Sequence, residues 1–193
     1  MKEELVYLGF VVSAVGLKMD PEKIKAIIEW PSPKSVFEVR SFHGLASFYR
    51  KFIKSFSKIN APIVETIKRD KQPFRWTVEV ENNFQLLKKK ITEKSILVLP
   101  DFSKPFQVKC DASGESIGGV LSKEDRPISY FSEKPNDSKK KYSSYDKEFY
   151  AVVQSLKNWR HYLMSKEFIL YQTIMHCSVL CNNQSLVKSM QNG

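Results

Sequence analysis

The chain has 193 residues, of which 42% are hydrophobic and 27% charged, and it carries a formal net charge of +10. This composition supports a buried core and argues against an intrinsically disordered protein. No apolar run is long enough to span a membrane, and the N-terminal residues lack the apolar segment of a signal peptide. We therefore expect an intracellular protein of the cytoplasm or nucleus, with no signal peptide, transmembrane segment or membrane partner.

The N-terminal part of the chain predicts strands followed by a short helix. Residues 5–13 are almost wholly apolar and predict one buried strand, and residues 17–19 predict a short return strand. Asp20 and Pro21 then predict a helix start, because Asp is a favoured N-cap and Pro fits the first helical position. A strand this apolar needs partners, so we expect it to belong to a larger sheet-containing domain.

Three further segments predict a small helical bundle. Ser35 and Glu38 form a capping-box pattern in front of the first helix, whose apolar residues recur at helical spacing as far as Ile53. The second helix is predicted over residues 59–68 and the third over about 77–93. These segments indicate helices that pack against one another through their apolar stripes.

Positive charge is concentrated in residues 36–75, which hold nine basic and three acidic residues, a net of +6. Aromatic residues are interleaved with the basic ones. Four of the basic residues lie mostly off the apolar stripe of the first bundle helix, namely Arg40, Arg50, Lys51 and Lys54. This combination of basic and aromatic residues is compatible with binding to a nucleic-acid backbone. It is equally compatible with an amphipathic helix whose basic face is solvated, and composition leaves both interpretations open.

A proline-flanked segment at residues 100–105 predicts a domain boundary. Beyond it, alternating apolar and polar residues predict a strand over residues 106–110, which ends at Asp111. Three glycines between residues 114 and 119 predict a tight turn. Further strands are predicted at 120–122, 127–132 and 168–171, and one long helix at 143–163 with Phe149, Val152 and Leu156 inward. The order β-β-β-α-β predicts an α+β domain with a helix across one face of a mixed sheet.

Two carboxylates of this second domain are candidate metal ligands. Asp111 stands at a strand end beside a glycine-rich turn, where a carboxylate can hold a metal ion next to a polyanion. The alternative is an Asp that caps a hairpin turn. Glu148 stands in the first turns of the long helix, where a solvated Glu is the common outcome. Because the helix packs on the sheet, its N-terminal end can approach Asp111, and a role for Glu148 depends on that approach.

The order of these motifs resembles a known family. Residues 7–23 are similar to the end of a polymerase palm, and residues 30–53 to a thumb and connection region. Residues 109–132 and 142–163 are similar to the strands and first helix of an RNase H-like domain. Over residues 5–171 the chain thus resembles the reverse transcriptase and RNase H-like region of a plant gypsy-type LTR retrotransposon Pol polyprotein, as a truncated fragment.

The resemblance implies an α+β architecture of four parts. They are the end of the palm at 1–30, the helical thumb and connection at 31–100, a partial RNase H-like domain at 101–171, and a divergent tail at 172–193. The implied parent activity is RNA-directed DNA synthesis together with Mg²⁺-dependent cleavage of RNA in RNA–DNA hybrids. The implied partner is nucleic acid, contacted by Arg40, Arg50, Lys51 and Lys54 of the thumb-like region, and no small-molecule substrate is predicted.

The resemblance also makes Asp111 and Glu148 the first two catalytic, metal-binding carboxylates of an RNase H-like site. The family continues with a third carboxylate after the fourth strand, but residues 172–193 contain no Asp or Glu, and no Tyr-x-Asp-Asp polymerase motif occurs. We therefore expect poor Mg²⁺ binding and neither catalytic activity. The alternatives are a residual nucleic-acid-binding module and an inert pseudogene product. In the latter, the sheet ends at the fourth strand and leaves an uncovered edge, a hazard for aggregation.

Overall fold

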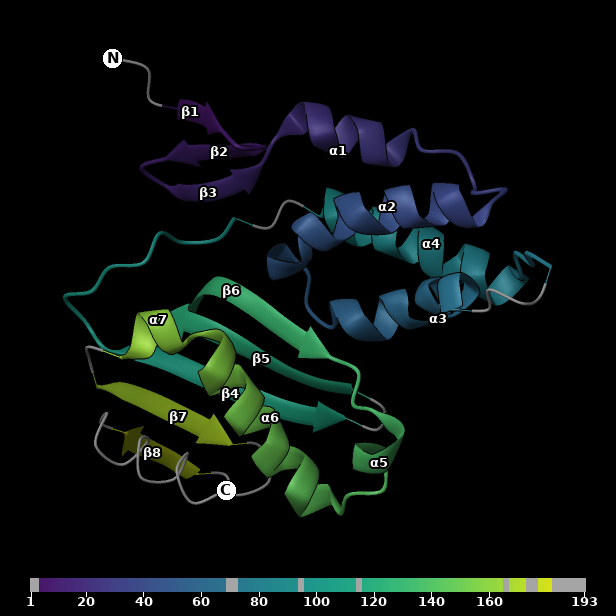
Figure 1. Cartoon of the computed structure of the whole chain (residues 1–193). Helices are drawn as coiled ribbons and strands as arrows, with labels where there is room; N and C mark the ends of the chain where they lie inside the picture. The colour runs from purple at the N-terminus through teal and green to yellow at the C-terminus, as the bar shows by residue number, and fades with distance from the viewer. Residues whose placement is uncertain are drawn as a thin grey trace. The chain divides into compact units, whose positions relative to one another are not determined.

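The computed structural model describes residues 4–68, 73–93, 96–113, 116–164, 167–172 and 177–181. The chain divides into two compact units, Met1–Leu97 (unit 1) and Val98–Gly193 (unit 2), shown in Figure 1. Each unit combines one sheet with helices, which confirms the predicted α+β class. Among the described residues, no helix is both long and apolar enough to cross a membrane.

Unit 1 opens with a three-stranded antiparallel sheet in the order β1-β2-β3. The strands are β1 (Glu4–Tyr7), β2 (Phe10–Ser13) and β3 (Gly16–Met19). The prediction of one buried strand over residues 5–13 was wrong. Leu8 and Gly9 adopt φ angles of 47° and 77°, so the chain reverses after four residues and makes a hairpin. As a result β1 is exposed along its whole length, while Val11 and Met19 of the next two strands are buried.

The helices of unit 1 begin where side chains cap them. They are α1 (Pro21–Ile28), α2 (Val36–Phe48), the 3-10 helix η1 (Arg50–Phe52), α3 (Phe56–Lys68) and α4 (Val78–Thr92). The side chains of Asp20, Ser35 and Thr77 each accept a hydrogen bond from a backbone N–H in the first turn of their helix. The first bundle helix ends at Phe48 instead of continuing to Ile53. The chain turns through η1 and still buries the side chains of residues 49, 52 and 53.

Aromatic side chains join the helices of unit 1 to its sheet. Phe10 of β2 stacks on Phe48 and Phe52, with ring centroids 4.9 and 5.8 Å apart. The Tyr49 hydroxyl donates a hydrogen bond of 3.0 Å to the carbonyl of Gly9 in the first hairpin turn. Deeper in the bundle, Phe42 of α2 and Phe84 of α4 pack with ring centroids 4.6 Å apart. These contacts fix the hairpin on the end of the bundle that carries η1.

Unit 2 is built on a five-stranded mixed sheet in the order β6-β5-β4-β7-β8, crossed on one face by α6 (Figure 1). Its elements are β4 (Phe106–Ser113), β5 (Ser116–Lys123), β6 (Arg126–Glu133), α5 (Asp137–Lys140), α6 (Ser144–Asn158), α7 (Arg160–Leu163), β7 (Phe168–Gln172) and β8 (Cys177–Cys181). Among the described strands of this sheet, β4 and β7 pair in parallel and the other neighbours pair antiparallel. The predicted β-β-β-α-β order is confirmed. The sheet does not end at its fourth strand, however. Strand β8 pairs antiparallel with β7 and occupies the hydrogen-bonding edge that was expected to be uncovered.

Two glycines of β5 explain how α6 packs on the sheet. Gly118 and Gly119 were expected in a turn, but they lie within the strand, opposite Asp111 and Cys110. A Cβ atom on Gly119 would lie 2.6 Å from Ser155 Oγ and 3.1 Å from the Trp159 ring, whereas one on Gly118 would make an ordinary contact at 3.4 Å. Gly119 is therefore needed for close approach of the helix, not for a turn.

The core of unit 2 lies between the sheet and α6. It buries Phe106, Val108, Cys110, Ile117, Leu121, Ile128, Ala151, Val152, Leu156, Trp159, Leu163 and Phe168. The expectation that Phe149 faces this core was wrong, since its side chain is 57% exposed and the neighbouring Glu148 is buried. The predicted long helix is also interrupted at Trp159, where α6 gives way to the short α7.

Candidate functional site

Asp111 lies near the C-terminal end of β4, on the central strand of the sheet. Residues Phe106, Val108 and Cys110 of this strand point into the core, so the strand alternation leaves Asp111 on the other side, and its side chain is exposed. Its strand partner is Gly118, which has no side chain to cover it. The carboxylate is therefore accessible at the end of the sheet, as a ligand or a nucleic-acid contact requires.

Glu148 reaches the same end of the sheet from the helix. Helix α6 begins at Ser144, where the Ser143 side chain accepts a hydrogen bond from the Asp146 backbone N–H at 3.1 Å. Four residues into the helix, Glu148 is only 7% exposed. Its Oε1 atom accepts a hydrogen bond from the backbone N–H of Ala112, the residue after Asp111, at 3.3 Å. The predicted approach of the helix start to the end of β4 is thus observed.

The surroundings of Glu148 disfavour its ionised form. Burial raises the pKa of Glu148, the hydrogen bond from Ala112 opposes this rise, and the charge of Asp111 adds to it. The second carboxylate oxygen, Oε2, is buried and has no hydrogen-bond partner in the described part of the chain. A cation beside Oε2 would relieve both the burial penalty and the repulsion from Asp111.

The described residues do not fit a two-metal centre. Such centres place two ions about 3.5–4 Å apart and need ligands around both of them. In the ranges that the structure describes, no three His, Cys, Asp or Glu side chains gather into one group. Among the described residues, the candidate donors are the unpartnered Oε2 atom of Glu148 and the exposed carboxylate of Asp111. The expected absence of a third carboxylate after Tyr171 concerns residues that lie largely outside the described ranges.

The four predicted nucleic-acid-binding residues of unit 1 differ in their surroundings. Arg50 is the first residue of η1 and Lys54 lies two residues after its end, both with exposed side chains. Arg40 is exposed on α2, just over two turns before that helix ends. Lys51 is half-buried, and its ammonium nitrogen lies 4.1 Å from the ring centroid of Phe10. Burial lowers the pKa of Lys51. Lys51 therefore takes part in the packing of the hairpin on the bundle, whereas Arg40, Arg50 and Lys54 are exposed.

Sequence reasoning missed two parts of this site. The backbone N–H of Ala112 holds Glu148, but a backbone group carries no residue-type signal that a sequence can reveal. The close approach of α6 depends on Gly119, whose glycine was visible in the sequence but indicated a turn equally well. Both features depend on contacts between segments that are far apart in the sequence, α6 with β4 and α6 with β5.

The comparisons with known proteins identify this arrangement. Residues 76–170 match the family described as an RNase H-like domain found in reverse transcriptase. These residues form a reverse-transcriptase RNase H-like domain. The match begins just before α4 and ends within β7, so it includes β4, β5, β6, α6 and both carboxylates of the candidate site, but not β8.

Similar proteins come from transposons of animals and fungi. The chain is 42% identical over 173 residues to the Pol polyprotein of the transposon gypsy of Drosophila melanogaster, covering 84% of this chain and 17% of that protein. It is 31% identical over 196 residues to the Tf2-3 polyprotein of Schizosaccharomyces pombe, covering 99% of this chain and 14% of that protein. The Tf2-3 match reaches past the RNase H-like domain into residues 172–193. The chain thus corresponds to the reverse transcriptase and RNase H-like region of Pol polyproteins, and spans less than a fifth of their length.

Solved structures share the fold at lower sequence identity. A foamy viral protease-reverse transcriptase in complex with double-stranded DNA superposes with a TM-score of 0.84 at 22% identity, over 97% of this chain and 33% of that one. The same kind of protein in complex with an RNA/DNA hybrid superposes with a TM-score of 0.81 at 23% identity, over 88% and 24% of the two chains.

Proposed function

We propose that this chain is a nucleic-acid-binding segment of a retrotransposon Pol polyprotein that does not itself cleave RNA. The domain assignment that supports this has the palm end at 1–30, thumb and connection at 31–100, RNase H-like residues at 101–171 and a tail at 172–193. The observation that supports the proposal is that Glu148 accepts a hydrogen bond from the residue after Asp111, while no group of three His, Cys, Asp or Glu side chains occurs among the described residues. The parent polyprotein would act in the cytoplasm or nucleus.

The parent activity is DNA synthesis on RNA and Mg²⁺-dependent cleavage of the RNA strand of RNA–DNA hybrids. In RNase H-like enzymes Mg²⁺ supplies a strengthened water nucleophile and stabilises the leaving oxygen. We derive no cleavage step for this chain, because its described donors do not fit two ions. We assign the element to plants from the resemblance of its motifs. The relatives reported above come from Drosophila and fission yeast, and a genomic locus outside plants would overturn that origin.

Nucleic-acid binding is supported by the charge on unit 1. Arg50 is exposed at the start of η1, Lys54 is exposed just after its end, and Arg40 is exposed on the helix before it. The structures that share this fold include protease-reverse transcriptases in complex with an RNA/DNA hybrid and with double-stranded DNA. We infer that these three residues neutralise backbone phosphates, while Lys51 contributes mainly to the fold.

The test is a salt titration of binding to a labelled RNA–DNA hybrid, followed by fluorescence anisotropy. Each phosphate contact contributes about −0.9 to the slope of log K against log salt concentration for a B-form duplex. We expect R50Q and K54Q each to reduce the slope by roughly that amount. The matched control is K25Q, which removes a cation that is 75% exposed on α1, away from the basic region. Slopes for R50Q and K54Q that equal the slope for K25Q would refute the proposed interface.

A further inference from the structure

Residues 100–105 were expected to mark a domain boundary, and in the structure residues 98–105 are bonded to the sheet and helices of unit 2. The Val98 backbone N–H donates a hydrogen bond of 2.8 Å to the carbonyl of Pro127 at the start of β6. Phe102 packs edge-on against Phe106 and stacks on Tyr162, with ring centroids 5.5 and 6.4 Å apart. We call residues 98–105 the strap.

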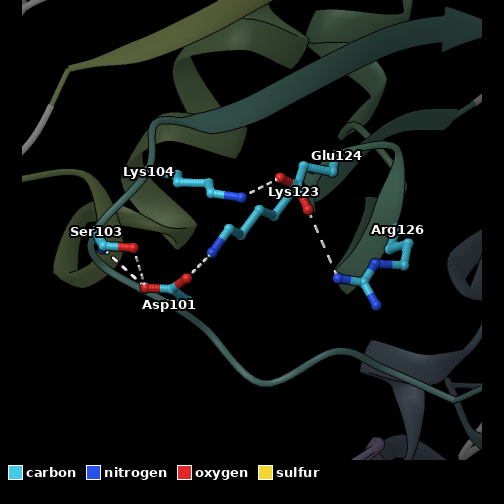
Figure 2. Close-up of polar contacts among 6 residues, drawn as sticks. All are labelled: Asp101, Ser103, Lys104, Lys123, Glu124 and Arg126. Carbon is cyan, nitrogen blue, oxygen red and sulfur yellow. Dashed lines mark hydrogen bonds and ion pairs between the residues drawn. The ribbon is translucent and has the colours of Figure 1, made fainter.

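An ion pair between Asp101 and Lys123 also holds the strap (Figure 2). Lys123 is the last residue of β5, and its side chain is only 5% exposed. A buried ammonium group is stable only with a partner, because burial removes its hydration. Lys123 donates to one carboxylate oxygen of Asp101, and the backbone N–H and hydroxyl of Ser103 donate to the other at 2.9 and 2.6 Å. The strap therefore carries the counter-charge of a buried lysine.

A second ion pair holds the strap to the next turn of the sheet. Lys104 Nζ lies 2.5 Å from Glu124 Oε1, and the other oxygen of Glu124 lies 3.7 Å from Arg126 (Figure 2). Glu124 and Asp125 form the two-residue turn between β5 and β6, with φ angles of 50° and 60°. The Asp101 and Lys104 pairs thus bind the strap to consecutive residues, Lys123 and Glu124.

The residue before the strap, Leu97, is hydrogen-bonded to the sheet of unit 1. Leu97 exchanges two backbone hydrogen bonds with Leu17 of β3, at 2.7 and 3.0 Å. Consecutive residues are therefore bonded into two different sheets, Leu97 into the sheet of unit 1 and Val98 into that of unit 2. With the strap fastened, no free residue separates the two units along the chain.

We propose that the strap is a conformational device that sets the length of the tether between the two units, with the Asp101–Lys123 pair as its fastening. When the strap is bound to unit 2, no unbonded residue connects the two units. Released, the strap adds the eight residues 98–105, which can extend about 3.3–3.6 Å each, or up to about 26–29 Å. Release of the strap would let the RNase H-like unit reach a different position on a bound duplex. The inference about the strap itself does not depend on nucleic-acid binding.

The test compares chymotryptic cleavage after Phe102 in three full-length chains under native conditions. D101N keeps the size of the side chain and removes its charge. D125N is the matched control, because it removes an exposed ion pair with Lys109 from the adjacent turn and leaves the strap contacts intact. We expect cleavage after Phe102 to be at least tenfold faster in D101N than in the native chain, and to change less than twofold in D125N.

Cleavage after Phe131 in β6 monitors unfolding of unit 2 in the same digests. An unchanged rate at Phe102 in D101N would overturn the proposal. If D101N raised the cleavage rates after Phe102 and after Phe131 by the same factor, the proposal would be overturned as well. The strap would then open only when the whole of unit 2 unfolds. Hydrogen exchange at the Val98 amide gives an independent readout. Its rate should also rise at least tenfold in D101N, and an unchanged rate would contradict release of the strap.

Discussion

The packing of α6 on Gly119 positions Glu148, and replacing this glycine tests that packing. In G119A the new methyl group would lie 2.6 Å from Ser155 Oγ and about as close to Trp159 as the 3.1 Å found for an ideal Cβ. Real Cβ atoms do not tolerate the first distance, so Ser155, Trp159 or the helix must shift. Overpacking of this kind costs about 1–3 kcal/mol. Against this, replacing glycine with alanine lowers the conformational entropy of the unfolded chain, which stabilises the folded state by about 0.4–1 kcal/mol.

The expected net loss in G119A is therefore about 1–2 kcal/mol in the free energy of unfolding of unit 2. For a domain of roughly 100 residues this lowers the melting temperature by about 4–16 °C. The matched control is G118A, in the same strand, where an added Cβ makes only an ordinary 3.4 Å contact with the Phe131 carbonyl. G118A lowers the conformational entropy of the unfolded chain by the same amount and introduces no clash. Its melting temperature should therefore be unchanged or slightly higher than that of the native chain.

Differential scanning calorimetry of the native chain and both variants measures these shifts. A second-site change, S155A, removes the atom closest to the new methyl group and should restore part of the loss when combined with G119A. Equal melting temperatures for G119A and G118A would refute the close approach of α6 to β5. So would a double variant G119A/S155A that is less stable than the sum of its single changes.

Two further substitutions test individual polar groups. Y49F removes the hydrogen bond to Gly9 and should destabilise unit 1 by about 0.5–1.5 kcal/mol in urea unfolding. Burial raises the pKa of Tyr49 to about 12, so the native chain should lose stability between about pH 10 and 12, and Y49F should lack that loss. Burial also raises the pKa of Glu148, so the native chain should lose stability as pH rises through that folded-state pKa. E148Q should remove this loss and be more stable by about 1 kcal/mol at neutral pH in thermal melts, and a less stable E148Q would contradict it.

Local signals in the sequence predicted local structure well. Asp20 and Ser35 cap the helices they were expected to cap, because a cap depends on a few neighbouring residues. The alternation from Phe106 to Cys110 likewise predicted the buried face of the central strand. Such features need no knowledge of distant segments.

Features that depend on distant contacts were not predictable from the sequence. Phe149 is more apolar than Glu148, yet Glu148 takes the buried position because the end of β4 supplies a backbone donor there. Gly119 indicated a turn until the helix that packs on it was known. The ion pair between Asp101 and Lys123 joins residues that are 22 positions apart, and no local pattern in the sequence indicates it. Each case is decided by which segments the fold brings together.

The most direct test of the proposed function is to incubate the purified chain with an end-labelled RNA–DNA hybrid, with and without Mg²⁺, and to measure binding and RNA cleavage in the same samples. We predict salt-dependent binding in both conditions and intact RNA in both, because Asp111 and Glu148 do not make a two-metal centre. Cleavage of the RNA strand that requires Mg²⁺ and disappears in D111N would contradict the account.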